Sequence, residues 1–262
     1  MKQKISIIIP VLNEESSIVP FLGTLQNYRK NGHEIIIVDG GSYDNTVNLA
    51  QIFVDQLLNS DPGRAKQMNL GARHAKNAIL LFLHSDTILP ACADTIIINS
   101  LSSHKYWGRF NIQLSGHSFI FRIIEYMINL RSKYTKVATG DQAIFINKNI
   151  FNKINGYPNI KLMEDIALSK KLRKRYSCVC LTEKVITSSR RWEKQGVYRT
   201  IILMWSLRFL YYIGVKPGFL FKLYYRKNNT TCCLVFTKNP EPGKTKTRLI
   251  PAIGINGAYK VH

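Results

Sequence analysis

Three short apolar runs alternate with helical patterns along residues 1–101, and this alternation restricts the fold more than any other feature. The runs cover residues 5–9, 34–38 and 79–83. Runs this short and continuous are typical of strands buried on both faces of a sheet. Because helical patterns separate them, the strands should be parallel and joined by right-handed crossovers. The sequence therefore predicts an α/β fold with a Rossmann-like first half.

The helical segments between these strands have apolar residues three or four positions apart. Asn13 and Asp44 are placed to cap the first two helices, because their side-chain oxygens can accept hydrogen bonds from a first helical turn. A third helix should cover residues 64–75. The predicted buried faces are Ile18, Phe21, Leu22 and Leu25 in the first helix, and Val47, Ala50, Val54 and Leu57 in the second.

Beyond residue 101 the pattern becomes a mixture of strands and helices. Strands are expected at residues 107–114 and 142–146, and helices at 119–130 and 165–175. These patterns divide a domain at 1–227 into a nucleotide-binding half (1–101), a mixed-sheet half (102–189) and a basic, aromatic helical segment (190–227). A polar linker then separates residues 228–262, which we interpret as a fragment of a second domain.

The chain is strongly basic. Lysine and arginine number 37 against 16 acidic residues, which gives a net charge of +21 over 262 residues. This charge favours nucleotide phosphates, an anionic membrane or nucleic acid as partners, or reflects a composition bias with a solvated surface. The five cysteines have no metal-binding spacing, and an odd number indicates reduced thiols in the cytoplasm. Neither a signal peptide nor a membrane-spanning helix is expected.

Polar residues follow each predicted strand, where parallel sheets place their ligands. These residues are Pro10, Asn13 and Glu14 after the first strand, Asp39 and Gly40 after the second, and Asp86 after the third. No G-x-G-x-x-G follows the first strand, so this half is not a dinucleotide site. Carboxylates and amides at neighbouring strand tips suit hydrogen bonds to a base and a ribose. Each residue taken alone could instead cap a helix or hold a turn.

Two helix starts carry further charge. Arg64 and Lys66, with Gln67, open the third helix, where cations oppose the helix dipole, so a phosphate partner is favoured over a plain solvated turn. Glu164 and Asp165 open the helix at 165–175, which ends in basic residues. Dipole optimisation alone would produce this arrangement. The functional alternative is that Asp165 is a general base.

These motifs together resemble those of family 2 glycosyltransferases, which have the GT-A fold. The resemblance rests on residues 4–15, 38–46 and 80–87 and on Glu164-Asp165, in that family's order and spacing. It is closer to a bacterial subgroup with Gly-Arg-x-x-Gln-Met-Asn, Leu-His-x-Asp-Thr, Gly-Asp-Gln and Arg-Arg-Trp signatures. Those signatures lie at residues 63–69, 83–87, 140–142 and 190–192, so the resemblance covers about residues 1–226.

The resemblance implies sugar transfer from a nucleotide-diphosphate donor to an acceptor hydroxyl, with inversion. Asp165 would be the general base beside Glu164, and Asp86 would ligate Mg²⁺ or Mn²⁺ against the diphosphate. It implies a nucleoside pocket of Pro10, Asn13, Glu14, Asp39 and Gly40, diphosphate or donor-sugar contacts from Arg64 and Gln67, and an acceptor side of Asp141, Arg190, Arg191 and Trp192. The acceptor, whether a sugar, a lipid or a carotenoid-like molecule, stays open.

One position departs from the family's common pattern. Many members carry Asp-x-Asp at the third strand tip, where this chain has His84-Ser85-Asp86. A neutral imidazole can ligate Mn²⁺ but is a poor ligand for Mg²⁺. His84 is therefore either a metal ligand or a hydrogen-bonded residue of the strand end, and the need for a metal stays open.

The basic, aromatic segment at 190–227 has two interpretations. Residues 200–215 are apolar on nearly every side except at Arg208, and Glu193 is the single acid of the segment. Such a helix either packs onto the domain or lies in a membrane interface with its cations at the headgroups. The second interpretation makes the protein peripheral on the inner face of the membrane and its acceptor lipid-linked.

Residues 232–249 resemble the opening of a nucleotidyltransferase-like family, with Lys-x-Pro-x-x-Gly-x-x-Lys-Thr-Arg-Leu after a strand. One strand and one loop cannot bury a core, so we assign this truncated fragment no activity. Two alternatives remain for the whole chain: a nucleotidyltransferase, which should carry a Gly-rich basic loop after the first strand, and an inactive sugar-nucleotide binder. A nucleic-acid-binding protein would explain the charge but not the strand-tip carboxylates, so no nucleic acid is expected.

Overall fold

The computed structural model describes residues 3–101 and 104–225, with the side chain of Arg191 left out. Its contacts divide the chain into two compact units, Met1–Tyr224 and Tyr225–His262. The predicted fragment at 228–262 and its transferase-like motif lie outside the described residues. The domain boundaries drawn from the sequence remain predictions.

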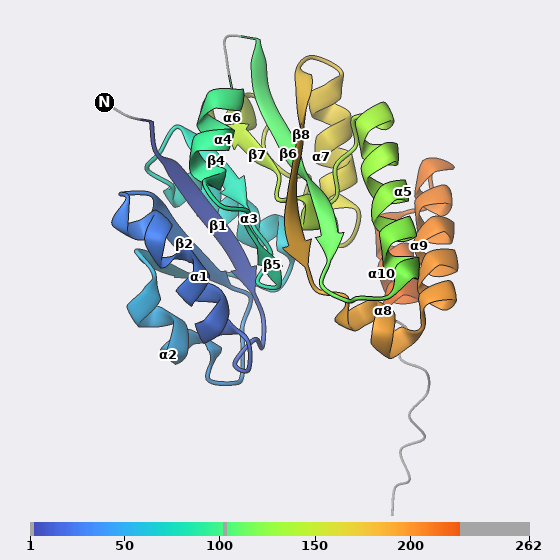
Figure 1. Ribbon diagram of the computed structural model, residues 1–262, viewed down its shortest axis with the longest axis horizontal. Helices are drawn as coiled ribbons and strands as arrows, with labels where there is room; N and C mark the ends of the chain where they lie inside the picture. The colour runs from blue at the N-terminus through green and yellow to red at the C-terminus, as the bar shows by residue number, and fades with distance from the viewer. Residues whose placement is uncertain (1–2, 102–103, 226–262) are drawn as a thin grey trace, which may run out of the picture. The chain divides into compact units, whose positions relative to one another are not determined.

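The strands of the first unit form a mixed sheet (Figure 1). The described strands are β1 (Ile5–Val11), β2 (Glu34–Asp39), β3 (Gln56–Asn59), β4 (Ile79–Phe82), β5 (Thr87–Ile88), β6 (Lys105–Leu114), β7 (Phe145–Asn147) and β8 (Ser177–Thr187). Within the described residues they make one eight-stranded sheet in the order β3-β2-β1-β4-β7-β6-β8-β5. The first four strands of this order are parallel, which confirms the parallel arrangement predicted for β1, β2 and β4 and adds the unpredicted β3. β7 is antiparallel to β4 and β6, β8 is parallel to β6, and β5 is antiparallel to β8.

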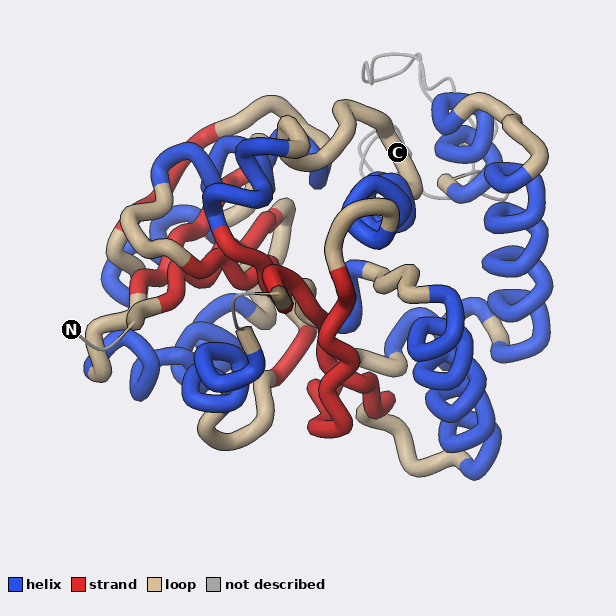
Figure 2. The backbone as a smooth tube through the Cα atoms, turned by 90° about the horizontal axis from the view of Figure 1, so that it is seen from above, coloured by secondary structure: helices blue, strands red, loops and turns tan. Residues whose placement is uncertain are grey.

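Helices lie on both sides of the sheet (Figure 2). The described helices are α1 (Ile18–Lys30), α2 (Thr46–Ala50), α3 (Arg64–His74), α4 (Ala93–Ser100), α5 (Phe119–Thr135), α6 (Lys148–Lys153), α7 (Glu164–Arg173), α8 (Arg190–Gln195), α9 (Val197–Tyr212) and α10 (Pro217–Tyr224), with 3-10 turns η1 (Gln51–Phe53) and η2 (Gly140–Gln142). α1 and α4 share one hydrophobic core, and α3, α6 and α7 share a second. A third, smaller cluster joins α9 to α10.

Alternate residues of the parallel strands face opposite cores. Ile7 and Ile9 pack with α1, whereas Ile8 packs with α3, and all three side chains are at most 1% exposed. The same alternation holds for Ile37 and Val38 in β2. Branched side chains suit this pleated, doubly covered surface. The prediction of strands buried on both faces is confirmed.

Several element boundaries differ from the sequence prediction. The second helix is shorter than expected, because α2 ends at Ala50 and Leu57 lies in β3. Asn13 does not cap α1, which begins at Ile18 with Ser17 as its N-cap. The strand expected at 142–146 begins only at Phe145, because Gln142 belongs to η2 and Ala143 has a left-handed conformation with a φ of 47°. β8 was not predicted, since its partly exposed Cys, Thr and Glu residues form no apolar run.

Gly71 marks the close approach of α3 to β1. A Cβ at this position would lie 2.5 Å from Ile8 Cγ2. Gly71→Ala should therefore lower the free energy of unfolding by about 1–3 kcal/mol through overpacking. Gly23→Ala in α1 is the matched control, because no atom lies within 4 Å of its added Cβ. That variant should gain up to about 1 kcal/mol from helix propensity. Chemical denaturation measures both, and equal stabilities would contradict this packing.

Candidate active site

The loops that follow β1 and β2 are joined by hydrogen bonds. The backbone N–H of Asn13 donates to Ser42 Oγ (2.9 Å), and Asn13 Oδ1 accepts the N–H of Tyr43 (3.0 Å). Asp39 Oδ2 accepts the N–H groups of Gly41 and Ser42, both at 2.9 Å. The two strand tips therefore form one edge, as the sequence predicts. The Asp39 carboxylate accepts hydrogen bonds from the turn that follows it, so it holds the conformation of this loop.

Gln67 on α3 holds the ends of β1 and β2 together through hydrogen bonds. Its side chain is 4% exposed, and its Nε2 donates to the carbonyls of Val11 (2.9 Å) and Val38 (2.8 Å). A Cβ on Gly40 would lie 3.0 Å from this amide, which explains why a glycine follows β2. Both N–H groups of Gln67 hold the strand ends, so the predicted diphosphate contact cannot use them, and the alternative contact with the donor sugar stays a prediction.

A cavity of about 190 Å³ lies beyond the end of β4. It brings together seven of the predicted site residues: Arg64, His84, Asp86, Asp141, Glu164, Asp165 and Trp192. The predicted nucleoside residues at the tips of β1 and β2 are not part of its lining. Arg190 is exposed and also lies outside the lining. The structure thus unites the predicted catalytic residues in one cavity and keeps the nucleoside residues apart from it.

Asp86 opens to this cavity at the end of the segment that follows β4. Asp86 is an exposed residue that lines the cavity, and partial desolvation of its carboxylate by the surrounding protein raises its pKa. The charge of Arg64 acts in the opposite direction and lowers that pKa, while Asp141 and Glu14 raise it. Arg64 is therefore the cation that favours the ionised form of Asp86.

His84 packs against the backbone of η2. A Cβ on Gly140 would lie 2.5 Å from His84 Cε1 and Nε2, so only glycine fits there without movement. Burial and the charge of Arg64 lower the pKa of His84 to about 3, and the imidazole is neutral. This contact fits a supporting role for His84 behind Asp86. Metal ligation by His84 remains a prediction.

Asp165 lies at the start of α7 and is held by two backbone donors. The N–H of Gly140 donates to Asp165 Oδ2 (2.8 Å), and the N–H of Ile166 donates to Oδ1 (2.7 Å). Burial raises the pKa of Asp165, whereas these two N–H groups and Arg208 lower it. The charge of Asp141 also raises the pKa of Asp165. Burial and the Asp165 charge raise the pKa of Glu164 to about 7.

The raised pKa of Glu164 predicts a pH-dependent stability. The folded chain binds this proton more tightly than the unfolded chain, whose carboxyl titrates near 4.5. The stabilisation is thus complete below about pH 4.5 and is lost as the pH rises through about 7. Glutamine cannot ionise, so Glu164→Gln should gain stability relative to the parent protein between about pH 5 and about pH 8. Thermal unfolding at both pH values measures this difference, and a constant difference would contradict the assignment.

Two arginines of this region were missed by the sequence analysis. Arg131 on α5 and Arg208 on α9 lie near the cavity, and Arg208 lines it. Arg131 Nε and Nη2, Arg208 Nε and Asp141 Oδ1 are buried and have no hydrogen-bond partner in the described part of the chain. Arg208 had stood out only as the one charged residue of the apolar stretch 200–215, and Arg131 is one of several charged residues of α5.

The carboxylates at the cavity restrict the kind of divalent-cation site that the protein can form. In the described residues, no three His, Cys, Asp or Glu side chains are grouped around a common metal position. Asp86 alone among the strand-tip carboxylates opens to the cavity next to Arg64. Mg²⁺ in nucleotide sites commonly takes one or two carboxylates, with phosphate oxygens and waters completing the shell. The residues fit a cation shared between Asp86 and a diphosphate, and do not fit an all-protein cage.

The glycosyl transferase family 2 model matches residues 6–149, more than half of the chain. The chain belongs to glycosyl transferase family 2. The matched residues include both strand-tip loops, Asp86 and Asp141. The family predicted from the sequence is confirmed.

Curated members of family 2 match only part of the chain. A PGL/p-HBAD biosynthesis glycosyltransferase of Mycobacterium bovis is 36% identical over 98 residues, which are 35% of this chain and 38% of that protein. Glycosyltransferase AglE of Haloferax volcanii is 35% identical over 91 residues, 31% of this chain and 30% of that protein. The chain thus spans less than two fifths of the length of these relatives.

Solved structures show which fold this family 2 chain has. TarS 1–349 of S. aureus superposes with a TM-score of 0.59 at 18% identity, over 71% of this chain and 60% of that one. The mannosyltransferase PcManGT of Pyrobaculum calidifontis, in complex with GDP-Man and Mn²⁺, has a TM-score of 0.55 at 15% identity, over 71% and 57%. At these identities the likeness concerns the fold, which is GT-A, as predicted.

Proposed function

We propose that this family 2 protein transfers a sugar from a nucleotide-diphosphate donor to an acceptor hydroxyl, with inversion at the anomeric carbon. One observation carries the proposal. The Asp165 carboxylate is fixed by the N–H groups of Gly140 and Ile166 in the same cavity as Asp86 and Arg64. A base and a diphosphate-binding pair in one cavity are what such a transfer requires.

Asp165 acts as the general base. The acceptor oxygen forms a bond to the anomeric carbon while the bond from that carbon to the diphosphate oxygen breaks. The departing nucleoside diphosphate takes the electron pair of the broken bond, and the acceptor proton passes to Asp165. Because the acceptor attacks opposite the leaving group, the anomeric configuration inverts. Glu164, whose pKa is raised to about 7, and Asp141 shape the acceptor side together with Trp192.

The donor lies along the edge formed by the tips of β1, β2 and β4. Its nucleoside faces the joined loops that contain Pro10, Asn13, Glu14, Asp39 and Gly40, and its diphosphate faces Arg64. Asp86 would hold Mg²⁺ or Mn²⁺, whose charge offsets that of the departing diphosphate. Support comes from the superposed proteins: TarS 1–349 structures contain UDP or UDP-GlcNAc, and PcManGT contains GDP-Man with Mn²⁺.

A panel of sugar nucleotides tests the proposed reaction. The full chain is incubated with UDP-linked and GDP-linked sugars, with and without Mn²⁺, and the phosphate products are identified. We expect one donor to release its nucleoside diphosphate. Release of pyrophosphate would indicate a nucleotidyltransferase. Binding of a donor without any turnover would indicate an inactive sugar-nucleotide binder.

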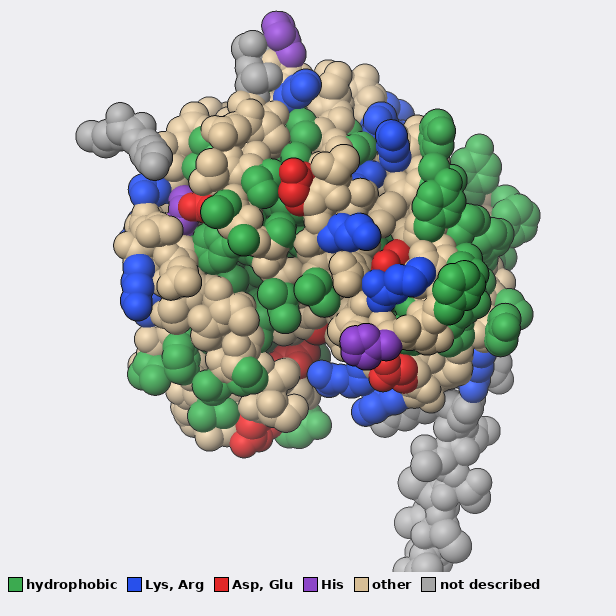
Figure 3. Space-filling view, in the orientation of Figure 1, with side chains coloured by type: hydrophobic (Ala, Val, Ile, Leu, Met, Phe, Trp, Pro, Cys, Tyr) green, Lys and Arg blue, Asp and Glu red, His purple; other side chains and the backbone are tan. Residues whose placement is uncertain are grey.

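The helical segment supports a peripheral contact with an anionic membrane. α9 buries Thr200 and Leu207 but exposes 62% of Trp205 and 64% of Phe209, and hydrophobic side chains gather over α5 and α9 in Figure 3. Among the described residues, none of the helices has the length and apolar character needed to cross a membrane. In the membrane-interface interpretation, these exposed apolar side chains insert among the lipids at the membrane surface.

Vesicle sedimentation tests this contact. The protein should sediment with phosphatidylglycerol vesicles, and less so at a salt concentration on the order of 1 M, which screens surface charge. Ile202→Ser on α9 should weaken sedimentation. Ile52→Ser should not, although Ile52 is exposed to a similar degree, 76% against 67% for Ile202. Equal effects of the two substitutions would contradict the contact.

A further inference from the structure

A cleft between α5 and α9 leads out of the catalytic cavity. Its walls are apolar side chains of both helices together with Trp192: Ile120, Ile123, Ile124, Met127, Ile128, Ile201, Met204 and Trp205. The cleft and the catalytic cavity share Ile128, Met204, Trp192 and two polar residues, Asp141 and Arg208. An elongated apolar group could therefore lie between the helices while its polar end reaches Asp165.

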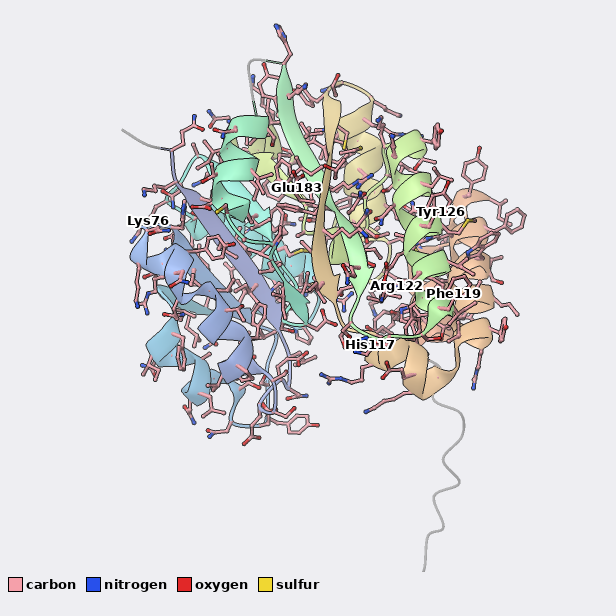
Figure 4. All side chains as sticks on the ribbon, in the orientation of Figure 1. Lys76, His117, Phe119, Arg122, Tyr126 and Glu183 are labelled. Atoms are coloured by element: carbon pink, nitrogen blue, oxygen red, sulfur yellow. The ribbon has the colours of Figure 1, made fainter. Side chains whose placement is uncertain are left out.

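The outer end of this cleft opens on the exposed apolar face. Ile123 and Met127 on α5 are 45% and 46% exposed, and Trp205 on α9 is 62% exposed. Phe119 and Tyr126 extend this face along α5, on the side of the molecule where α9 lies (Figure 4). They are 79% and 64% exposed. A hydrocarbon chain bound in the cleft would therefore extend out of it at this exposed apolar face.

Arg208 and Asp141 line the cleft, and Arg131 lines an adjoining pocket that shares Met127, Ile128, Trp205 and Arg208 with it. Arg131 Nε and Nη2, with Arg208 Nε, are buried donors that no described residue satisfies, and Asp141 Oδ1 is a buried acceptor in the same state. The two guanidinium groups also repel one another: burial and Arg208 lower the pKa of Arg131 to about 10. Buried polar groups are almost always hydrogen-bonded, so unsatisfied donors and an acceptor lining a cavity indicate a ligand. That ligand must offer an anionic group and a hydroxyl.

We propose that the cleft binds the acceptor, and that the acceptor is a membrane phospholipid whose headgroup carries a free hydroxyl. The inference rests on the proposed sugar transfer and names the acceptor class. The lipid phosphate accepts hydrogen bonds from Arg131 and Arg208, a geometry that guanidinium groups favour. The headgroup hydroxyl faces Asp141 and Asp165, and the hydrocarbon lies between α5 and α9.

The chemistry of the reaction balances with this acceptor. The headgroup oxygen forms the new bond to the anomeric carbon and loses its proton to Asp165. The nucleoside diphosphate leaves with the electron pair of the broken bond. The phosphodiester of the lipid stays intact and keeps its charge on the two arginines throughout. A soluble phosphorylated alcohol would satisfy the arginines but leave the apolar cleft empty, so the bilayer lipid is the occupant that uses the whole site.

Tryptophan quenching tests binding without relying on turnover. In Trp205→Phe, the remaining indoles are Trp192 at the cleft and Trp107, which is fully buried. We expect vesicles of brominated phosphatidylglycerol to quench the Trp192 emission, and brominated phosphatidylcholine to quench it much less. Arg131→Gln and Arg208→Gln in this background should weaken the phosphatidylglycerol titration at least about tenfold. Lys133→Gln is the matched control, because Lys133 is also a cation of α5 but lines a separate pocket that contains neither Arg131 nor Arg208. Thermal melting verifies that each variant folds.

Sugar transfer is measured in parallel on the unmodified protein. Label from the donor should appear in the lipid fraction with phosphatidylglycerol vesicles and not with phosphatidylcholine vesicles or with glycerol 3-phosphate. Quenching that is the same for both lipid headgroups, or that neither arginine substitution weakens, overturns the inference. Transfer of the sugar to glycerol 3-phosphate and not to the lipid overturns it as well. If the protein forms a dimer before lipid is added, and this dimer prevents quenching by the vesicles, a second copy of the chain occupies the cleft. That result also overturns the inference. Failure of every donor to react, with headgroup-selective quenching intact, instead overturns the proposed sugar transfer.

Discussion

Asp165→Asn should abolish most sugar transfer while leaving donor binding intact. Asparagine has nearly the same size as aspartate but cannot take the acceptor proton. Loss of a general base lowers kcat by about 10²–10⁴-fold. The donor contacts proposed for Arg64 and Asp86 are untouched, so the Kd for the nucleotide should be unchanged. Steady-state kinetics and equilibrium binding on the same preparation measure both quantities.

A matched substitution controls for the loss of charge. Asp61 lies at the surface, where its side chain is 78% exposed and pairs with Lys66. Asp61→Asn should therefore leave kcat unchanged. Asparagine at 165 can accept only one of the two N–H bonds from Gly140 and Ile166, so thermal melting should accompany the kinetics. Near-normal turnover of a folded Asp165→Asn protein would remove Asp165 from the role of base.

Asp86→Ala should also abolish transfer, but by weakening the donor side. The carboxylate at the tip following β4 is the residue we assign to the cation and the diphosphate. Its removal should cost several kcal/mol of transition-state stabilisation, about 10³-fold in kcat/KM. In contrast to Asp165→Asn, the affinity for the nucleotide in the presence of Mn²⁺ should fall.

A second substitution at residue 86 shows whether the negative charge alone is enough for donor binding or whether its position also matters. Asp86→Glu keeps the carboxylate and should retain part of the Mn²⁺-dependent donor affinity that Asp86→Ala loses. Titration of the nucleotide with and without Mn²⁺ measures the difference. The same donor affinity for Asp86→Ala and the parent protein under both conditions would show that Asp86 does not act on the donor.

The parallel half of the fold could be predicted because its sequence signal is local. Each of the strands β1, β2 and β4 contains three or four consecutive apolar residues, and each is buried on both faces. β3 and β8 could not be found in this way, because both carry polar and partly exposed residues that strand pairing stabilises from outside the segment. Tertiary pairing outweighed local propensity in these two strands.

The acids of the candidate site were predictable because carboxylates at strand tips and helix starts stand out in sequence. The contacts that hold these acids in place could not be predicted. Gly140 presents its N–H to Asp165 and makes room for His84, and these contacts join residues far apart in the chain. Met163 has a φ of 69°, a left-handed conformation unusual for methionine, directly before the two acids. Backbone strain of this kind is frequent at functional sites, but no residue pattern announces it.

Arg131 and Arg208 show a different limit. Arg131 is one of several charged residues of α5, and Arg208 interrupts a stretch of α9 that is apolar on nearly every side. Such a residue ordinarily extends its charge into solvent. Only the packing of α5 beside α9 turns both side chains toward one region and leaves their donors buried. Sequence spacing within either helix contains no information about that approach.

The stereochemistry of the reaction tests the central claim most directly. The claim is that one displacement, with Asp165 as its base, moves the sugar from the donor to the acceptor oxygen. Proton NMR at early times, on the sugar that the full chain transfers or hydrolyses from an α-linked donor such as UDP-GlcNAc, reports the anomeric configuration. The structure predicts a β-configured product that Asp165→Asn forms far more slowly. An α-configured product formed at the same rate by both proteins would contradict it.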